Sequence, residues 1–210
     1  MTSRTARRHD EHRREALAAL REQQTRQARR VRRRNIAVAT LVAIAVAAVV
    51  SAMMLSSKPT SSSATRVAPD FTLTDTAGQQ VHLAAYRGHT VVLYFSEGAG
   101  CGSCLQQMSA IEKDRAAFDR AGVTVLPIVM NTRAQITSDM RTYGVTTPFL
   151  LDDGAVSTAY KTIGHGMHAG LPGHSFVLID KDGVQRWYGE YPSMYLAPSD
   201  LLAQVSKHLG

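Results

Sequence analysis

The residues of this chain with the clearest chemical potential are Cys101 and Cys104, the only two cysteines among 210 residues. A Gly-Ser pair separates them within the stretch YFSEGAGCGSCLQQM, residues 94–108. Two thiols at this spacing can exchange electrons through a disulfide, contribute to a metal site, or form a structural crosslink. The elements that position the pair, and the compartment it occupies, decide between these roles.

A predicted strand and a predicted helix flank the pair. Residues 90–96, TVVLYFS, are apolar and rich in β-branched side chains, which is typical of a strand buried on both faces. Apolar side chains then recur at helical spacing from Leu105 to Phe118, and Gly122 is expected to end that helix. Cys101 is therefore expected at or near the N-cap, where unpaired backbone N–H groups and the helix dipole favour a thiolate.

This placement gives the two cysteines different roles in thiol–disulfide exchange. The thiolate is the attacking species, so Cys101 is the candidate nucleophile. Cys104 follows one helical turn later and is expected to be less exposed, in a position to resolve a mixed disulfide. A structural disulfide over so short a loop would remove little entropy from the unfolded chain. A zinc site needs four ligands, and the sequence has no second cysteine pair. Redox chemistry is therefore favoured over the metal and structural alternatives.

The N-terminal quarter of the chain predicts a membrane anchor. Residues 1–34 contain 12 Arg against four acidic residues, so an Arg-rich tail carries the net charge of +7. Residues 36–55 have no charged side chain and match the length of about 20 apolar residues that crosses a bilayer. The positive charge before this segment places the N-terminus in the cytoplasm and the remainder of the chain outside. Disulfides persist on that side. We therefore expect a single-pass cell-membrane protein with an extracytoplasmic domain.

Four segments follow from this division. We expect a cytoplasmic tail over 1–34, a transmembrane anchor over 35–56, a Ser/Thr/Pro linker over 57–66 and one domain over 67–210. A cleaved signal peptide is the alternative to a retained anchor, although its basic region is usually much shorter. The tail lacks interleaved aromatic residues, so we expect it to contact anionic lipid headgroups and not nucleic acid.

Within the domain, predicted strands alternate with predicted helices. FTLTD and VHL flank a polar turn and predict a hairpin before the strand at 90–96. After the helix that follows the cysteines, the pattern predicts a strand at 123–130, a helix at 132–143, a short strand and helix within 147–164, a hairpin at 175–188 and a helix at 198–208. This order predicts an α/β sandwich with a mixed central sheet flanked by helices.

The order of several motifs resembles a known family. PDFTLTD, G-x-x-V-x-L, YRG, VVLYF, CGSC and FVLIDKDG follow one another between residues 68 and 187. This is similar to thioredoxin-like proteins of the alkyl hydroperoxide reductase/thiol-specific antioxidant (redoxin) type, which include extracytoplasmic oxidoreductases and peroxiredoxins. The resemblance implies a thioredoxin-like sandwich with an N-terminal hairpin extension, and chemistry at the cysteine pair.

The sequence departs from both branches of this family near the cysteines. Peroxidatic cysteines of the family lie in a P-x-x-x-T/S-x-x-C frame, which fits neither Cys101 nor Cys104. The thioredoxin-like members usually have an aromatic residue before the first cysteine and a proline between the two. Here Gly100 and the pair Gly102-Ser103 occupy these places. Peroxidase chemistry therefore stays an alternative to disulfide exchange.

Other candidate residues follow from the same resemblance. Tyr94 stands where thioredoxins have a buried carboxylate, so Glu97 is the nearest carboxylate that can accept a proton, unless it is an exposed loop residue. The substrate-clamping cis-proline of the family should directly precede the strand SFVLID. Matching on Phe176 places Gly173 there, one residue after Pro172. Either Pro172 contacts substrate through a bulge or the clamp is absent.

A histidine-rich loop precedes the same strand. The stretch IGHGMHAGLPGHSF contains His165, His168 and His174, and in this fold such a loop faces the cysteines. Soft sulfur ligands select Cu(I). Copper chaperones of cytochrome oxidase assembly resemble this arrangement, although their cysteines are usually spaced by three residues. Such a metal site would use Cys101, Cys104 and His174. We expect His165 and His168 to be solvated, and His174, which adjoins the strand, to approach the pair.

The sequence thus predicts a membrane-tethered, extracytoplasmic thiol–disulfide oxidoreductase that needs no cofactor. Client protein thiols or disulfides are the expected substrates, and a separate protein is expected to donate or accept electrons. The alternatives are a peroxidase, a copper chaperone, and a redox-sensing or structural module without turnover.

Overall fold

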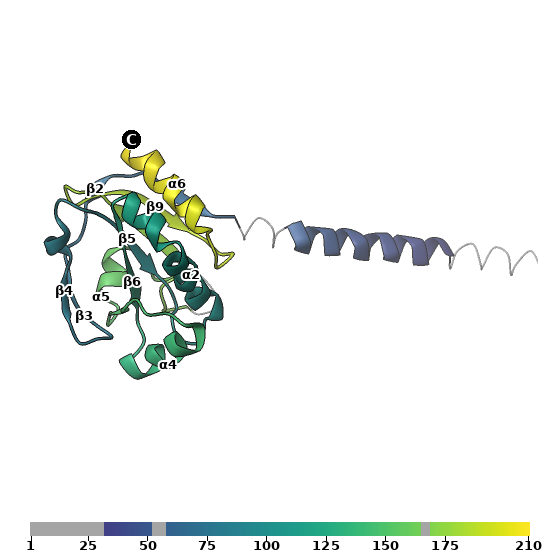
Figure 1. Ribbon diagram of the computed structural model, residues 1–210. Coiled ribbons are helices and arrows are strands. Elements are labelled where there is room, and N and C mark those ends of the chain that lie inside the picture. The colour runs from purple at the N-terminus through teal and green to yellow at the C-terminus, as the bar shows by residue number, and fades with distance from the viewer. Residues whose placement is uncertain (1–31, 52–57, 165–168) are drawn as a thin grey trace, which may run out of the picture. The chain divides into compact units, whose positions relative to one another are not determined.

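The computed structural model describes residues 32–51, 58–164 and 169–210 (Figure 1). The chain divides into two compact units, residues 1–55 and 56–210. In the first unit, one helix over Arg32–Ser51 is long and apolar enough to cross a membrane. By length and composition, a signal sequence near the N-terminus would pass the same test. The predicted Arg-rich tail falls almost entirely outside the described residues.

The second unit contains one mixed sheet of nine strands with helices around it (Figure 1). The strand order is β1-β9-β8-β5-β6-β7-β3-β4, and β2 also pairs with β9. β5 pairs in parallel with β6 and antiparallel with β8, which places it inside the sheet. The strands are β1 (Thr60–Ser62), β2 (Arg66–Val67), β3 (Thr72–Asp75), β4 (Gln80–His82), β5 (Thr90–Phe95), β6 (Val123–Val129), β7 (Leu150–Leu151), β8 (Ser175–Ile179) and β9 (Val184–Glu190).

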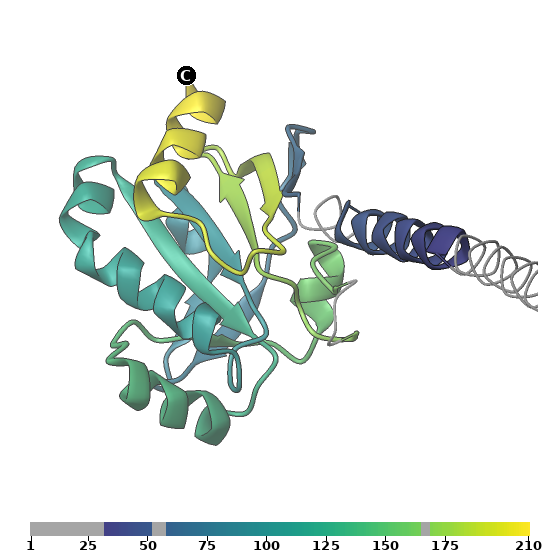
Figure 2. The same cartoon turned by 90° about the vertical axis from the view of Figure 1, so that its right-hand side faces the viewer.

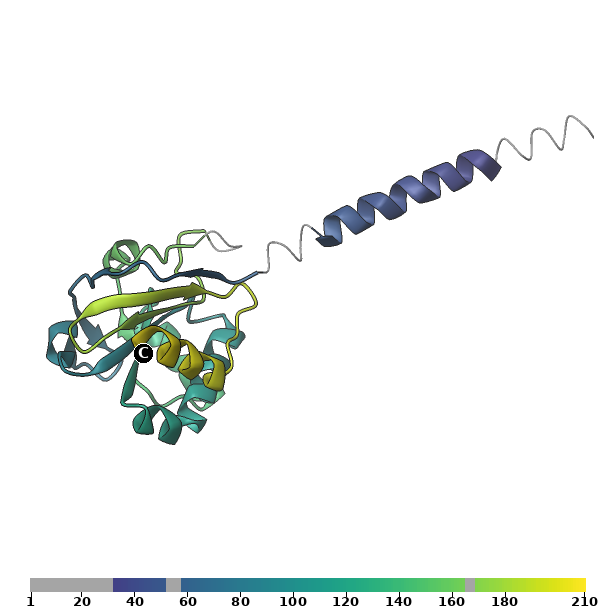
Figure 3. The ribbon, with the colours of Figure 1, turned by 90° about the horizontal axis from the view of Figure 1, so that it is seen from above.

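Helices cover both faces of this sheet. They are the 3-10 helix η1 (Leu83–Tyr86) and the α-helices α2 (Gly102–Lys113), α3 (Arg115–Arg120), α4 (Arg133–Tyr143), α5 (Ala155–Ala159) and α6 (Pro198–Leu209). Figures 2 and 3 show α2 and α6 on the same face of the sheet, where their apolar side chains join one core cluster with those of α3 and α4. Side chains of η1 and α5 belong to a second cluster.

The central strand β5 contributes to both clusters because alternate side chains of a strand point to opposite faces. Val92 and Tyr94 belong to the cluster with α2, and Val91, Leu93 and Phe95 belong to the other. All five side chains are at most 1% exposed. This confirms the prediction of a strand buried on both faces.

The helix predicted to run from the cysteines to Gly122 is instead two helices. Asp114, with φ −96° and ψ 15°, leaves the helical conformation between α2 and α3. Aspartate has a low propensity for helix interiors. α3 is therefore a separate helix, and its Phe118 is buried in the same cluster as Met108 of α2.

The helix predicted at 132–143 forms with the expected ends. The Thr132 hydroxyl accepts from the Gln135 N–H, and the Gln135 side chain accepts from the Thr132 N–H, which completes a capping box. Gly144 closes α4 in the left-handed conformation with φ 65°.

The segment expected as a linker contributes strands to the sheet. β1 pairs antiparallel with β9, with Ser61 opposite Gly189, and β2 pairs with the other end of β9. The Ser61 hydroxyl also accepts a hydrogen bond of 2.8 Å from the Trp187 indole N–H. An edge strand needs only backbone hydrogen bonds on one side, so a Ser/Thr-rich composition does not prevent it. Residues 60–62 and 66 of the predicted linker therefore pair with β9 of the domain.

Candidate active site

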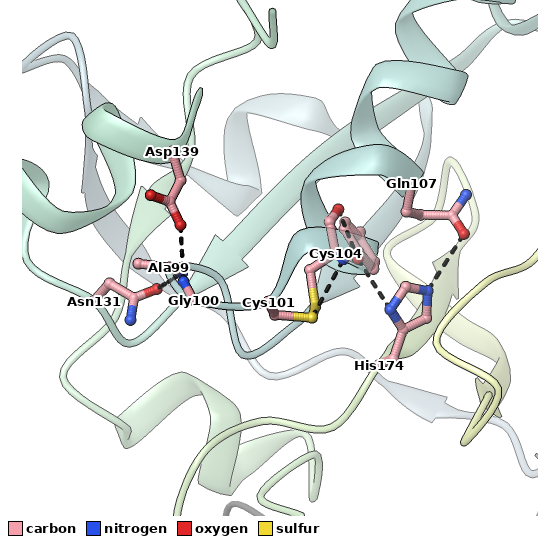
Figure 4. The surroundings of a disulfide bond; sticks show 9 residues. Ala99, Gly100, Cys101, Cys104, Gln107, Asn131, Asp139 and His174 are labelled. Carbon is pink, nitrogen blue, oxygen red and sulfur yellow. Dashed lines mark hydrogen bonds between the residues drawn. A yellow bond between two sulfur atoms is a disulfide. The ribbon is translucent and has the colours of Figure 1, made fainter. Parts of the chain in front are cut away.

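The cysteine pair lies where β5 leads into α2. Cys101 is the N-cap of α2, with φ −100° and ψ 91°, and Cys104 lies in the first turn. The two form a disulfide with a Cα–Cα distance of 5.3 Å (Figure 4). The Cys104 backbone N–H points at Cys101, with Sγ at 3.3 Å and the carbonyl oxygen at 3.1 Å. The predicted position at the helix start is confirmed.

The two sulfur-bearing residues differ in exposure. Cys101 is partly exposed, whereas Cys104 is 0% exposed and packs in the α2 core cluster. A molecule in solution can therefore approach Cys101 but not Cys104. After reduction, the N–H that now contacts Cys101 Sγ can stabilise a thiolate there, and the first turn of α2 has no acidic residue to oppose it.

The loop before Cys101 is held by two polar side chains from outside it. The Ala99 N–H donates to Asn131 Oδ1 and the Gly100 N–H donates to Asp139 Oδ2, both at 2.8 Å. Figure 4 shows both contacts beside the disulfide. Asn131 follows β6 and Asp139 lies on α4, so the loop is tied to a neighbouring strand end and to a separate helix. Sequence analysis did not identify either residue. Asn131 could have been identified because it directly follows the predicted strand that lies beside β5, and the ends of parallel neighbouring strands lie close together.

Glycine at positions 98 and 102 is explained by close approach of other side chains. Gly98 has φ 73°, and a Cβ there would collide with Asn131 Oδ1 and lie 2.8 Å from Val129 Cγ1. A Cβ on Gly102 would collide with the Tyr143 hydroxyl. The spacer between the cysteines therefore begins with Gly because Tyr143 of α4 covers it.

A chain of polar contacts runs behind Cys104. The Tyr94 hydroxyl donates to the Cys104 carbonyl oxygen over 3.2 Å and lies 3.1 Å from His174 Nδ1. His174 Nε2 lies 3.3 Å from Gln107 Oε1. The Gln107 amide in turn pairs with the backbone of Leu196, with both contacts at 2.8 Å. In Figure 4, His174 lies beside the disulfide on the side of Cys104. His174, which we expected to approach the pair, has its described side-chain contacts with Tyr94 and Gln107.

Burial controls the protonation of His174 and Tyr94 in this series of polar contacts. Burial lowers the pKa of His174 to about 4, so its imidazole is neutral at pH 7. Burial also raises the pKa of Tyr94 far above its ordinary value, and the charge of Glu97 raises it further. Tyr94 therefore acts as a hydroxyl and not as a phenolate.

Glu97, Pro172 and Gly173 are the other candidates predicted from the sequence. Glu97 is partly buried, and its charge acts on Tyr94. Pro172 is buried and bridges to Ile163, and the Gly173 N–H donates to the Thr162 carbonyl over 2.9 Å. Every peptide bond among the described residues is trans, including Leu171–Pro172.

The copper alternative finds little support in the described residues. His165 and His168 lie outside the described residues, as does Met167 between them. No group of three or more His, Cys, Asp and Glu side chains within the described ranges is arranged to hold a metal ion. Both ring nitrogens of His174 already face Tyr94 and Gln107.

Residues 64–188 match the family model described as the AhpC/TSA family. The chain belongs to this family. A chloroplastic peroxiredoxin Q of rice, Oryza sativa subsp. japonica, is 28% identical over 143 residues, which cover 68% of this chain and 61% of the rice protein. A candidate peroxiredoxin of Mycobacterium tuberculosis (strain H37Rv) is 31% identical over 121 residues, or 55% of this chain and 77% of that protein. The chain thus spans less than two thirds of the rice relative.

Solved structures of other proteins share the fold. A candidate protein disulfide isomerase of Bacteroides thetaiotaomicron has 30% identity and a TM-score of 0.54, over 69% of this chain and 88% of that one. The bacterioferritin comigratory protein of Xanthomonas campestris has 20% identity and a TM-score of 0.57, over 67% and 92%. These similarities confirm the thioredoxin-like sandwich and the redoxin-type resemblance seen in the motifs.

Proposed function

We propose that this chain is a thiol–disulfide oxidoreductase that acts through Cys101 and Cys104. One observation carries the proposal: a disulfide joins a partly exposed cysteine at a helix N-cap to a fully buried cysteine one turn later. This asymmetry suits one sulfur for attack on a client and the other for internal resolution. Membership of the AhpC/TSA family supports an enzyme based on thiol redox chemistry.

The reaction proceeds by two exchanges of sulfur partners. In the reducing direction, the Cys101 thiolate attacks one sulfur of a client disulfide, forms a mixed disulfide and releases the other client sulfur as a thiolate. The Cys104 thiol then loses its proton and attacks Cys101 Sγ, which expels the second client thiolate. Two client thiols and the Cys101–Cys104 disulfide result. A second protein must then reduce this disulfide, or oxidise the dithiol when the enzyme runs in the opposite direction.

A membrane tether and an extracytoplasmic site are part of the same proposal. The helix over Arg32–Ser51 has the length and hydropathy of a span, and the Arg-rich sequence before it favours an N-terminus in the cytoplasm. A disulfide that must survive between turnovers is also better suited to an oxidising compartment.

Peroxide reduction is the second candidate, because the rice and mycobacterial relatives carry the name peroxiredoxin. In that reaction, the Cys101 thiolate attacks a peroxide oxygen and becomes a sulfenic acid while an alcohol or water leaves. Cys104 then attacks that sulfur, expels water and forms the same disulfide. The P-x-x-x-T/S frame is absent before either cysteine, which favours disulfide exchange.

The two candidates are separated by presenting both substrates to the full chain in detergent micelles. We expect the reduced protein to cleave insulin disulfides in the presence of a thiol donor, and we expect Cys101→Ser to abolish this activity. Ser103→Ala changes the exposed spacer residue and is the matched control. If hydrogen peroxide is consumed rapidly while insulin stays intact, the result would contradict disulfide exchange and support the peroxidase function.

A further inference from the structure

A pocket of about 360 Å³ lies on the face of the sheet opposite the cysteine pair. Tyr160 and Tyr188 line it and pack in the core cluster of that face, whereas Cys101 and Cys104 belong with the cluster on the other face. Pockets that hold small organic molecules have volumes of about 300–1,000 Å³, so this one is large enough for such a ligand. The reaction proposed above uses none of the residues that line it.

A bulge in β9 brings two side chains of that strand into the pocket. Gln185 and Tyr188 are three residues apart, and in a regular strand such side chains point to opposite faces. Leu178 of β8 pairs with Trp187, but the next residue of β8 pairs with Gln185, so one residue of β9 is extra in the ladder. Gln185 and Tyr188 therefore both line the pocket.

Neutral partners hold Arg66 of β2 at the wall of this pocket. Its Nε donates to Gln185 Oε1 over 2.9 Å, and its Nη2 donates to the Ala159 carbonyl over 3.1 Å. The guanidinium also lies over the Tyr160 ring, with Cζ 5.7 Å from the ring centroid. These two bonds leave three of the five guanidinium N–H groups without a hydrogen bond to the described residues. Arg66 is thus fixed in place by groups that do not neutralise its charge.

Lys161 adds a second positive charge to the pocket from a backbone conformation that lysine rarely adopts. It follows α5 with φ 58°, in the left-handed region that favours glycine or asparagine at the end of a helix. Its N–H donates to the Thr158 carbonyl over 3.0 Å, which keeps it there. The side chain is exposed, lines the pocket and forms no ion pair within the described ranges. A conformation of this kind is a reason to look for a function of the residue that adopts it.

Asp70 and Glu190 are the acidic residues whose charge reaches the two tyrosines, and neither lines the pocket. The Asp70 carboxylate accepts two backbone N–H groups at 3.0 and 3.1 Å, and Glu190 Oε2 accepts from the Tyr188 hydroxyl over 3.2 Å. Burial raises the pKa of Tyr160 and of Tyr188, so both hydroxyls are uncharged at pH 7. The residues that line the pocket therefore carry two positive charges and no negative charge.

We propose that this pocket binds a small organic anion with an apolar ring. The anionic group, a carboxylate, sulfonate or phosphate, contacts Arg66 and Lys161, because the planar guanidinium can bind two oxygens of such a group at once. The partly exposed ring of Tyr188 contacts the apolar part of the ligand. Gln185 is a positioning residue, since its amide oxygen holds Arg66 Nε. This inference is independent of the chemistry proposed for the cysteines.

Calorimetric titration with naphthalene-2-sulfonate tests the site on the full chain in micelles of an uncharged detergent, with the heat of titrating empty micelles subtracted. We expect one site per chain that saturates below about 1 mM ligand. Arg66→Gln should weaken the affinity by at least about tenfold, the effect of losing a charge-assisted hydrogen bond. Lys161→Gln should weaken it about threefold, because its ammonium is more exposed. The matched controls, Arg120→Gln and Lys113→Gln, remove the same charges from exposed positions of α3 and α2 and should bind as wild type does.

A second variant keeps both cations and fills the pocket. Ala64 lines the pocket at an exposed position between β1 and β2, so Ala64→Phe should abolish binding without removing a charge. The neutral analogue naphthalene-2-sulfonamide should bind wild type at least about tenfold more weakly than the sulfonate.

Four results would overturn the proposal. They are no saturation of wild type, undiminished binding by Ala64→Phe, equal binding of the sulfonamide, and an equal loss of affinity in Arg66→Gln and Arg120→Gln. The last result would mean that the sulfonate responds to the overall charge of the protein and not to this pocket.

Discussion

At the scale of single residues, His174 ties the stability of the domain to pH. Its pKa is about 4 in the folded protein and about 6.5 when unfolded, so the unfolded chain binds more protons between these values. The contribution of this neutral histidine is fully present above pH 6.5 and is lost as pH falls toward 4. The difference is worth roughly 3 kcal/mol at most.

This linkage is measured by urea unfolding, followed through the fluorescence of Trp187, the single tryptophan and a fully buried one. We expect wild type to lose up to about 3 kcal/mol of unfolding free energy between pH 7 and pH 4 beyond what His174→Gln loses. The effect of Glu112 and Asp180, whose pKa values are also lowered in the folded protein, is present in both wild type and His174→Gln. It therefore cancels in the difference between the two proteins. Parallel curves for the two proteins would contradict the assignment. His82→Gln, at an exposed site, should follow wild type.

Gly102 gives a second test at a single residue. Alanine is a better helix former than glycine, yet its Cβ would collide with the Tyr143 hydroxyl. We expect Gly102→Ala to lower the unfolding free energy by about 1–3 kcal/mol, the usual cost of overpacking. Adding Tyr143→Phe removes the colliding oxygen and should restore most of the loss. A double variant no more stable than Gly102→Ala would show that Tyr143 is not the cause.

At the scale of elements, the loop between β5 and α2 is held by Asn131, which follows β6, and by Asp139 of α4. The Asp139 carboxylate accepts from the Gly100 N–H at 2.8 Å, and such a bond to a charged group is worth about 1.5–3 kcal/mol. We expect Asp139→Ala to speed hydrogen exchange at the Gly100 amide by roughly 10- to 100-fold. Asp139→Asn keeps an acceptor oxygen and should retain most of the protection. Unchanged exchange in the alanine variant would mean that the loop is held elsewhere.

The elements also show what local sequence could and could not predict. The apolar run of β5, the capping residues of α4 and the N-cap position of Cys101 are local patterns, and the structure matches them. The apolar spacing from Leu105 to Phe118 continues across Asp114, so the spacing alone predicted one helix where the structure has two. β1 pairs through its backbone with a strand more than a hundred residues away, so its composition carried no signal.

The same distinction applies inside the candidate site. Cys101 and Cys104 were identified because they are adjacent in sequence and chemically distinctive. His174 was identified from its place before β8. The roles of Gln107 and Leu196 arise only when α2 meets the segment before α6, since the two residues are 89 positions apart. Asn131 and Asp139 act on the loop through tertiary contacts in the same way.

At the scale of the whole molecule, the proposed function depends on which side of a membrane the cysteines occupy. In bacterial cells that express the full chain, we expect the protein to fractionate with membranes and to keep an N-terminal tag, because the Arg32–Ser51 helix is the proposed anchor. Replacing several arginines of residues 26–34 by glutamine should lower the fraction of molecules with a cytoplasmic N-terminus, because positive charge before the helix favours that orientation.

The orientation is read from the partly exposed Cys101 in a Cys104→Ser background, where it is the single thiol of the chain. After mild reduction of intact spheroplasts, a membrane-impermeant maleimide should label Cys101 without lysis. Labelling that requires lysis would place the site in the cytoplasm, where a resting disulfide is disfavoured. Efficient labelling together with loss of the N-terminal tag would instead mean a cleaved signal sequence. The domain would then act as a released extracytoplasmic enzyme, with the same chemistry and no tether.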